Sequence, residues 1–310
     1  MNGKFLLGVD GGKSKTECAI LELGGTRRMV ARGGGSSHEG VGLESAGLAL
    51  RAVVLNVLQQ GNISRSDIVA ACFAMAGMDV PPDQDNINKA MVEPLGLSCP
   101  IIICNDAWAG FRAGSASGVG MCVSVGTGLT FCGRNYSGDQ LQFEYPAPPG
   151  IDFFIRNALI AEYYGIGPKC SFTSAYLQAV GLATLEEFFL SHYPQCRDSV
   201  RSITRTQIVE ARRTVFHPAT FHDPATCDML QKFAHSLAEI MCGLGARLNF
   251  GSTAFDLVLS GSILTKGKHP ALNDTLIGYI TKLFPGARPV IVGGIPVDGA
   301  LLMAAELLQK

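Results

Sequence analysis

The segment LGVDGGKSKT, residues 7–16, decides how this chain begins to fold. Its apolar run ends at Asp10, and two glycines follow directly, which is typical of a β-strand that enters a tight turn. The turn then supplies a hydroxyl at Ser14 and a cation at Lys15. Backbone N–H groups in such a turn, together with these side chains, suit phosphate oxygens. An ordinary glycine hairpin with an exposed lysine would contain the same residues, so both interpretations remain open here.

The elements around this segment follow a pattern that occurs twice. Apolar runs bounded by glycine predict strands, and apolar residues at helical spacing predict helices. The first half has predicted strands at 4–10, 17–23, from 28, 68–75 and 100–104, and predicted helices at 43–58, 83–92 with Asp83 as its cap, and from 108. The second half has predicted strands at 121–125, 129–134, 140–145, 255–260 and 288–292, and predicted helices from about 150 and at 225–248, 272–283 and 297–308. We therefore predict an α/β fold with two duplicated β-β-β-α-β-α units facing one cleft.

The composition is that of a globular protein with a large core, with 47% hydrophobic and 16% charged residues. Its formal net charge of -1 gives no overall attraction to a nucleic-acid backbone or an anionic membrane. The longest mainly apolar stretch, residues 68–78, is shorter than the roughly 20 residues that span a membrane, and no secretory signal is visible. The ten cysteines include no C-x-x-C pair, which indicates free thiols. We therefore expect a cytoplasmic protein.

A second glycine turn, SVGTG at residues 124–128, takes the matching place in the second unit. Alone, such a turn is weak as a signal, because hairpins use these residues constantly. Two such turns at equivalent positions of a duplicated fold could hold the phosphates of one nucleotide from both sides.

Asp106 ends a buried strand and precedes a predicted helix. A carboxylate at this place can accept a proton from a substrate hydroxyl, as phosphoryl transfer requires of a base. The alternative is a helix cap, a common use of aspartate. Both roles are compatible only if the carboxylate is not consumed by the cap.

Four motifs in this order resemble those of the BadF-type ATPase and N-acetylglucosamine kinase family, within the actin, sugar-kinase and heat-shock-chaperone superfamily. DGGKSKT resembles the first phosphate motif, DGGGTKT, and SVGTG resembles the second, SGTGS. LVLSGSILTKG at 257–267 resembles the adenosine motif, and PVDGALLMA at 296–304 resembles the connecting helix. The resemblance implies two ribonuclease-H-like lobes around a nucleotide cleft. Their expected bounds are 1–115 and 116–295, with a helical insertion at about 165–221 and a final segment, 296–310, that packs on the first lobe.

The resemblance also implies roles for individual residues, with ATP and Mg²⁺ as cofactors. Asp106 would be the base that takes the proton of a sugar hydroxyl, and Asp10 would hold Mg²⁺ through water. The expected phosphate and nucleoside contacts are Gly11, Gly12, Ser14, Lys15, Thr127, Gly128, Gly261 and Ser262. The expected sugar contacts are Ser37, His38, Gly77, Asp79 and Thr130.

One segment departs from the family's pattern. Pro148 and Pro149 replace the acidic pair that would hold sugar hydroxyls, and Asp152 is not in an equivalent place. Because proline side chains accept no hydrogen bonds, discrimination among sugars is expected to change. The four arginines of the insertion, at 201, 205, 212 and 213, could form a local basic patch, but solvation at the surface is the preferred interpretation.

The function expected from these residues is ATP-dependent phosphorylation of an amino sugar or related hexose derivative, of the N-acetylglucosamine or glucosamine type. One alternative is a catalytically altered regulator that binds ATP or a sugar, and another is an ATPase that acts with a partner protein. The redox-activator branch of the family needs cluster-binding cysteines, of which no convincing pair is present. The expected partner is a small-molecule sugar, with neither nucleic acid nor membrane, and a homodimer remains open.

Overall fold

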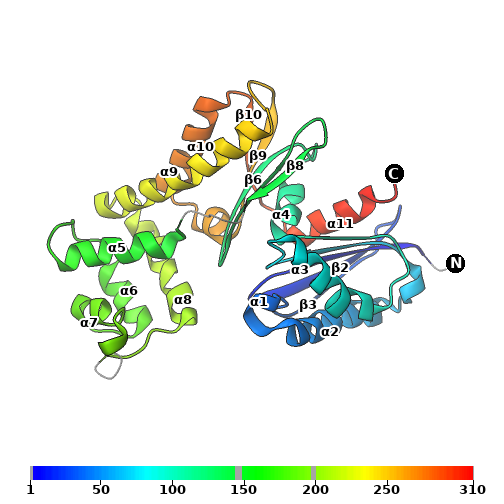
Figure 1. Cartoon of the computed structure of the whole chain (residues 1–310), viewed down its shortest axis with the longest axis horizontal. Coiled ribbons are helices and arrows are strands. Elements are labelled where there is room, and N and C mark those ends of the chain that lie inside the picture. The colour runs from blue at the N-terminus through cyan, green and yellow to red at the C-terminus, as the bar shows by residue number, and fades with distance from the viewer. Residues whose placement is uncertain (1–2, 144–148, 197–199, 310) are drawn as a thin grey trace.

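A computed structural model describes residues 3–143, 149–196 and 200–309. Figure 1 shows two parts, each built on a β-sheet, and a group of helices that extends from the second part. The sheets have five strands each, in the orders β3-β2-β1-β4-β5 and β10-β9-β6-β7-β8. Read from opposite edges, the two orders match, which confirms the predicted duplicated α/β fold.

The first sheet begins with an antiparallel meander of β1 (Phe5–Gly11), β2 (Lys15–Glu22) and β3 (Arg28–Gly34). Two further strands, β4 (Ile68–Met75) and β5 (Ile101–Cys104), join it in parallel on the other side of β1. β1 and β4 are buried along almost their whole length. Their continuous apolar runs are therefore those of strands covered on both faces.

The helices of the first lobe are α1 (His38–Val41), α2 (Leu43–Gly61), α3 (Pro81–Ile87) and α4 (Asp106–Gly114). α2 packs against β3 and β2. The predicted helix at 83–92 begins instead at Pro81, because proline suits the first helical turn. Asp83 is consequently not the cap residue, and its carboxylate accepts hydrogen bonds from the N–H groups of Asp79 and Val80. α4 also begins earlier than the predicted residue 108.

The second sheet repeats this plan. β6 (Gly120–Val125), β7 (Leu129–Arg134) and β8 (Gln140–Phe143) form its antiparallel meander, and β9 (Phe255–Ser260) and β10 (Ala287–Ile291) join in parallel. The larger helices of this lobe are α5 (Ile151–Tyr163), α6 (Thr173–Val180), α7 (Leu185–Leu190), α8 (Arg205–Val215), α9 (Pro224–Arg247) and α10 (Pro270–Leu283). Short 3₁₀ or π segments lie at Arg65–Asp67, Asn88–Val92, Glu93–Leu95, Pro194–Cys196, Pro218–Thr220 and Ile263–Gly267.

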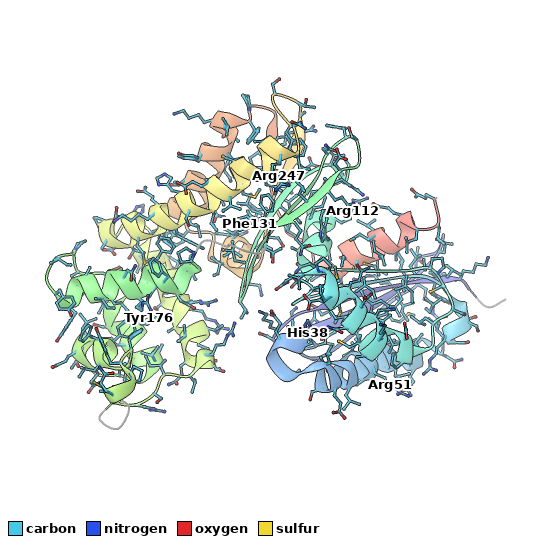
Figure 2. All side chains as sticks on the ribbon, in the orientation of Figure 1. His38, Arg51, Arg112, Phe131, Tyr176 and Arg247 are labelled. Atoms are coloured by element: carbon cyan, nitrogen blue, oxygen red, sulfur yellow. The ribbon has the colours of Figure 1, made fainter. Side chains whose placement is uncertain are left out.

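The helical group and the second sheet share one hydrophobic core. Phe131 on β7 and Tyr176 on α6, both labelled in Figure 2, belong to the same cluster of buried side chains. The helices α6, α7 and α8 are therefore packed onto the lobe through α5 and α9 rather than tethered to it loosely. Among the described residues, no helix is long and apolar enough to cross a membrane.

Two helices connect the sheets to each other. α4, which follows the first sheet, packs on β9 and β6 of the second. α11 (Pro296–Glu306), which follows the second sheet, packs on β1 and β4 of the first and also on α4. The two helices cross closely at Gly299, where a Cβ atom would lie 1.9 Å from the carbonyl oxygen of Ala109. This exchange of helices brings the carboxyl ends of both sets of parallel strands to one place.

Candidate functional site

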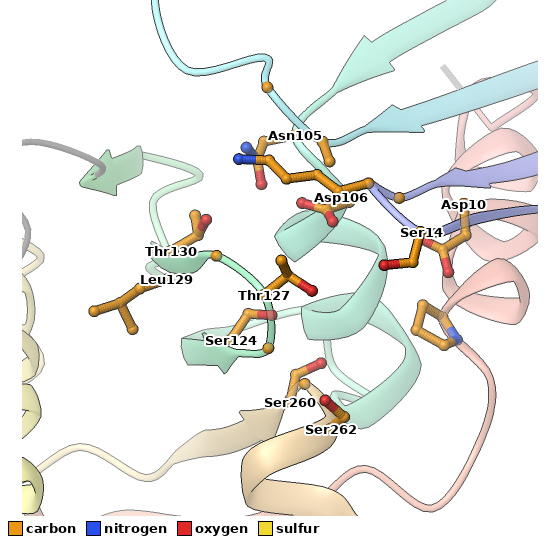
Figure 3. A pocket seen from close by; sticks show the side chains of 18 of the residues that line it. Asp10, Ser14, Asn105, Asp106, Ser124, Thr127, Leu129, Thr130, Ser260 and Ser262 are labelled. Atoms are coloured by element: carbon orange, nitrogen blue, oxygen red, sulfur yellow. The ribbon is translucent and has the colours of Figure 1, made fainter. Parts of the chain in front are cut away.

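The central cavity lies between the two lobes and has a volume of about 440 Å³. It opens where β1, β4, β5, β6 and β9 end, the position at which α/β sheets commonly bind ligands. In Figure 3, Asp106 lies between Ser14 of the first lobe and Thr127 of the second. The predicted site residues that line the cavity are Asp10, Gly12, Ser14, Lys15, Gly77, Asp79, Asp106, Thr127, Gly128, Thr130, Gly261 and Ser262. Gly11, Ser37 and His38 do not line it.

The first turn, residues 11–15, is held in shape by backbone hydrogen bonds. The N–H of Gly12 donates to the carbonyl of Lys15 at 3.0 Å, and the carbonyl of Gly11 accepts from the N–H of Ala76 at 2.8 Å. The N–H groups of Lys13 and Ser14 donate to no other group in the described part of the chain. Backbone donors for an anion are therefore supplied by Lys13 and Ser14, while Gly12 closes the hairpin.

The second turn, residues 126–128, has a corresponding arrangement. Its first N–H, that of Gly126, donates to the carbonyl of Gly128 at 3.0 Å. Within the described ranges, the N–H groups of Thr127 and Gly128 make no hydrogen bond. Each turn thus presents two adjacent backbone N–H groups to the same cavity, an arrangement that suits phosphate oxygens.

An arginine of the helical insertion holds the second turn in place. The Arg212 Nη1 group donates to the carbonyl of Gly126 at 3.0 Å, and its Nε and Nη2 groups donate to the two carboxylate oxygens of Asp152 at 2.7 and 2.5 Å. The Arg212 side chain is only 12% exposed. The prediction of a solvated surface arginine is therefore wrong for Arg212, because Asp152 on α5 supplies a partner 60 residues away in sequence.

The turn after β9 lies directly against the second turn. Gly261 has a φ of +81°, and a Cβ atom there would lie 2.3–2.6 Å from the backbone of Val125. Only glycine fits this close approach. The carbonyl of Gly261 accepts hydrogen bonds from the N–H and the hydroxyl of Thr265, at 3.0 and 2.9 Å. The adjacent Ser262 is thereby placed at the edge of the cavity.

Asn105, rather than Asp106, caps helix α4. Its side-chain oxygen accepts the N–H of Ala107 at 2.9 Å. Because the cap is a neighbouring residue, the carboxylate of Asp106 is left at the cavity wall. The condition under which Asp106 could act as a base is thus met in the structure.

The carboxyl groups of Asp10 and Asp106 have unusual protonation behaviour. Burial, together with the charge of Asp106, raises the pKa of Asp10 to about 7, against the opposing charge of Lys15. Burial and the charge of Asp79 raise the pKa of Asp106 to about 6, against the opposing effects of Lys13 and nearby backbone N–H groups. Neither carboxylate forms an ion pair with another described residue. Perturbed carboxyl groups of this kind are concentrated at functional sites.

Asp79 is held beside Asp106 by the helix cap itself. The side-chain amide of Asn105 donates to the Asp79 carboxylate at 3.0 Å, so one residue links the cap of α4 to the loop after β4. Gly77 in that loop has a φ of +86°, a backbone conformation that favours glycine. The loop can therefore turn sharply and return Asp79 to the cavity.

Ser37 and His38 lie at the start of α1, outside the cavity lining. The Ser37 hydroxyl and the Nδ1 atom of His38 are buried and have no hydrogen-bond partner among the described residues. The other ring nitrogen of His38 lies 3.5 Å from the carboxylate of Asp83. Unsatisfied buried polar atoms are uncommon, so these two are available to a polar ligand that reaches them. Their predicted role in sugar binding stays a prediction.

No group of three or more His, Cys, Asp or Glu side chains in the described part of the chain could hold a metal directly. A Mg²⁺ ion bound to nucleotide phosphates needs only one or two carboxylates and keeps several waters. Such a cation would offset the repulsion between the partly buried carboxylates of Asp10 and Asp106. The residues present therefore fit Mg²⁺ held through water.

Three residues that the structure brings to the site had no predicted role there. Lys13 lines the cavity, Asn105 caps α4, and Arg212 holds the second turn. Asparagine before an aspartate at a helix start is a usable signal, because both are preferred caps. Lys13 stands where the family motif has glycine, which also marks it. The contact of Arg212 has no local signal, since its partners lie far away in sequence.

A comparison of sequences agrees with the predicted resemblance, although no protein-family model matches the chain. The chain is 23% identical to N-acetyl-D-glucosamine kinase from Dictyostelium discoideum over 322 residues, an alignment that covers 98% of each protein. It is 30% identical over 135 residues, 44% of each protein, to N-acetylmuramic acid/N-acetylglucosamine kinase from Clostridium acetobutylicum.

The fold is also shared with a solved structure. A protein from Chromobacterium violaceum, provisionally named N-acetylglucosamine kinase, superposes with a TM-score of 0.71 at 19% identity. The superposition covers 98% of this chain and 100% of that one. The curated relatives confirm the resemblance to N-acetylglucosamine kinases that the four motifs predicted, and the solved structure confirms the fold.

Proposed function

We propose that this protein, which aligns with an N-acetylglucosamine kinase along almost its whole length, transfers the γ-phosphoryl group of ATP to a hydroxyl of an amino sugar. The observation that carries the proposal is the position of Asp106. Its carboxylate lies in the central cavity between two turns that each present adjacent N–H groups to an anion. Phosphoryl transfer requires this combination of a base and a preorganised phosphate site.

Asp106 takes the proton from the attacking sugar hydroxyl. That oxygen forms a bond to the γ-phosphorus while the bond from phosphorus to the bridging oxygen of ADP breaks, and ADP leaves with those electrons. A pKa of about 6 keeps most of the Asp106 carboxyl ionised at neutral pH while its basicity stays near the working pH. The hydrogen bond from Asn105 to Asp79 holds the residues beside Asp106 in one arrangement.

The phosphates of ATP lie between the first and second turns in this proposal. The N–H groups of Lys13, Ser14, Thr127 and Gly128 supply the donors. A neighbouring hollow of about 360 Å³ shares Gly126, Thr127 and Ser262 with the central cavity and takes the nucleoside. Phe216, Ile263 and Lys266 line that hollow.

Mg²⁺, when bound, neutralises charge on the phosphate oxygens and holds them in line. Asp10 is the residue that would hold it, through water. The sugar would meet Asp79, Gly77 and Thr130 at the cavity wall. Ser37 and His38 keep unsatisfied polar atoms nearby in the first lobe.

Pro148 and Pro149 were predicted to remove sugar contacts. Pro148 lies outside the residues that the structure describes. Their effect on sugar discrimination stays a prediction. The cytoplasmic location and a homodimer also stay predictions. The alternative of a regulator without catalysis is not favoured, because Asp10 and Asp106 both line the cavity and the relatives are kinases.

The test measures ADP release from Mg·ATP with N-acetylglucosamine, glucosamine, N-acetylmuramic acid, N-acetylmannosamine, glucose and no sugar. We expect ADP with at least one amino sugar and a loss of about 10²–10⁴-fold in kcat for Asp106→Asn. Circular dichroism and Mg·ATP binding of the variant control for folding. ADP release that needs no sugar and survives Asp106→Asn would overturn the proposal in favour of an ATPase. Silence with every sugar would also overturn it.

A further inference from the structure

We infer that Lys13, and not Lys15, is the lysine of the first turn that contacts the transferred phosphoryl group. The inference rests on the proposed kinase function and adds a catalytic residue to it. The site predicted from the sequence used Lys15 for this contact. The structure gives the two lysines different partners, and these partners decide which ammonium group is available to a phosphate.

Lys15 is committed to a buried carboxylate. Its ammonium group donates to Glu17, whose side chain is completely buried. The Nε group of Arg32 donates to the other oxygen of the same carboxylate at 2.8 Å. Lys15 and Glu17 are two residues apart on β2, so both side chains lie on the same face of the strand. Although the Lys15 side chain is 59% exposed, its transfer to a phosphate would leave the buried Glu17 carboxylate with Arg32 alone among its described ion-pair partners, which favours the contact between Lys15 and Glu17.

Lys13 has a partner that is easily exchanged. Its Nζ atom lies 2.7 Å from the Glu39 carboxylate on α1, and the two side chains are 30% and 41% exposed. Exposed ion pairs of this kind contribute little to stability. The phosphates of a nucleotide carry more negative charge than a single carboxylate and accept charge-assisted hydrogen bonds, so they can take Lys13 from Glu39.

The charged residues that line the cavity also favour Lys13 as the phosphate contact. Its described lining contains three carboxylates, Asp10, Asp79 and Asp106, and only two cations, Lys13 and Lys15. A bound nucleotide adds further negative charge. Because Glu17 holds Lys15, Lys13 is the remaining protein cation for the phosphates within this lining.

Lys13 would donate to a non-bridging oxygen of the γ-phosphoryl group. Charge on these oxygens must be stabilised as the group passes from ADP to the sugar oxygen, and a fixed cation does this most effectively in a site closed to water. Glu39 then acts as the resting partner of Lys13 and as a competitor of the nucleotide.

The test compares Lys13→Met with the matched variant Lys15→Met in steady-state kinetics and thermal unfolding. We expect Lys13→Met to lower kcat by about 10²–10³-fold, with the KM for the sugar and the melting temperature close to those of the wild type. Lys13→Arg should restore part of the rate, since it keeps the charge. Lys15→Met should lower the melting temperature, because Glu17 loses a partner, and should lower kcat by less than Lys13→Met does. Glu39→Gln should lower the KM for ATP or leave it unchanged.

Three outcomes would overturn the inference. One is an active wild-type enzyme whose kcat changes less than about threefold in Lys13→Met. The second is a larger loss of kcat in Lys15→Met than in Lys13→Met. If the wild type phosphorylates no sugar, the proposed function fails separately, and the affinity for Mg·ATP then tests the phosphate contact of Lys13. The third outcome is an affinity of Lys13→Met equal to that of the wild type, which would reject the contact. A loss of affinity of about tenfold or more would support it.

Discussion

Replacing Asp152 by asparagine is expected to weaken ATP binding, although Asp152 does not line the central cavity. The substitution keeps the size of the side chain and removes the charge that pairs with Arg212. Arg212 donates from Nε and Nη2 to the Asp152 carboxylate and from Nη1 to the carbonyl of Gly126. Without the charged partner, the guanidinium group is less firmly placed, and the second turn loses part of its support.

The magnitude follows from the contacts and the exposure of the two side chains. A hydrogen bond to a charged group contributes about 1.5–3 kcal/mol. Arg212 is 12% exposed, but Asp152 is 41% exposed, so water compensates part of the loss. We expect a destabilisation of about 1–2 kcal/mol, which lowers the melting temperature of a chain of this length by about 1.5–3 °C. If all of it acted on the turn, the KM for ATP would rise by at most about 5- to 30-fold.

The assay is steady-state kinetics with ATP and the sugar varied separately, together with thermal unfolding. Asp228→Asn is the matched control, because Asp228 forms an ion pair with Lys232 on α9 in which both side chains are more than half exposed. That control should change the melting temperature by less than about 1 °C. A supporting role of the Asp152–Arg212 pair in ATP binding is excluded if Asp152→Asn behaves like Asp228→Asn, or if it raises the KM for the sugar and not that for ATP.

Three further perturbations test the site and its support. Because burial raises the pKa of Asp106 to about 6, kcat/KM should fall by about tenfold per pH unit below that pH, and a flat profile down to pH 5 would contradict its role as base. Burial opposes ionisation of Glu17, but Lys15 and Arg32 outweigh it and hold the pKa of Glu17 below its ordinary value. The unfolded chain then binds more protons, so the stabilisation is present above about pH 4.3 and is lost as the pH falls further. Acid unfolding should therefore show a steeper loss of stability in the wild type than in Glu17→Gln, and equal slopes would count against the ion pairs. Gly261→Ala should cost more than the roughly 1–3 kcal/mol of a strained backbone, since its Cβ would meet the Val125 backbone. Gly251→Ala, with a φ of +54° and open space around it, is the control in urea unfolding, and equal losses would reject the close contact.

Most of the secondary structure could be predicted because its signals are local. β4 and β9 begin and end at the residues that the apolar runs predicted, since a strand buried on both faces needs a continuous run bounded by turn residues. The sequence placed the start of α3 too late, because an aspartate is typical both of the cap and of the third helical position, and Asp83 takes the third position. The family motifs also brought most of the predicted site residues to one cavity.

The sequence alone was therefore sufficient to predict the succession of strands and helices along the chain, the duplicated unit and the carboxylate that follows β5, because each has a signal in residues close together in the chain. Only the tertiary structure decided the partners of the long cationic side chains. Lys13 meets Glu39 and Arg212 meets Asp152, while Lys15 is held by the buried Glu17. Lysine and arginine side chains are flexible enough to reach several neighbours. The partners of Lys13 and Arg212 are groups that the fold brings together from distant parts of the sequence, whereas the neighbouring Glu17 holds Lys15 because the fold buries its carboxylate.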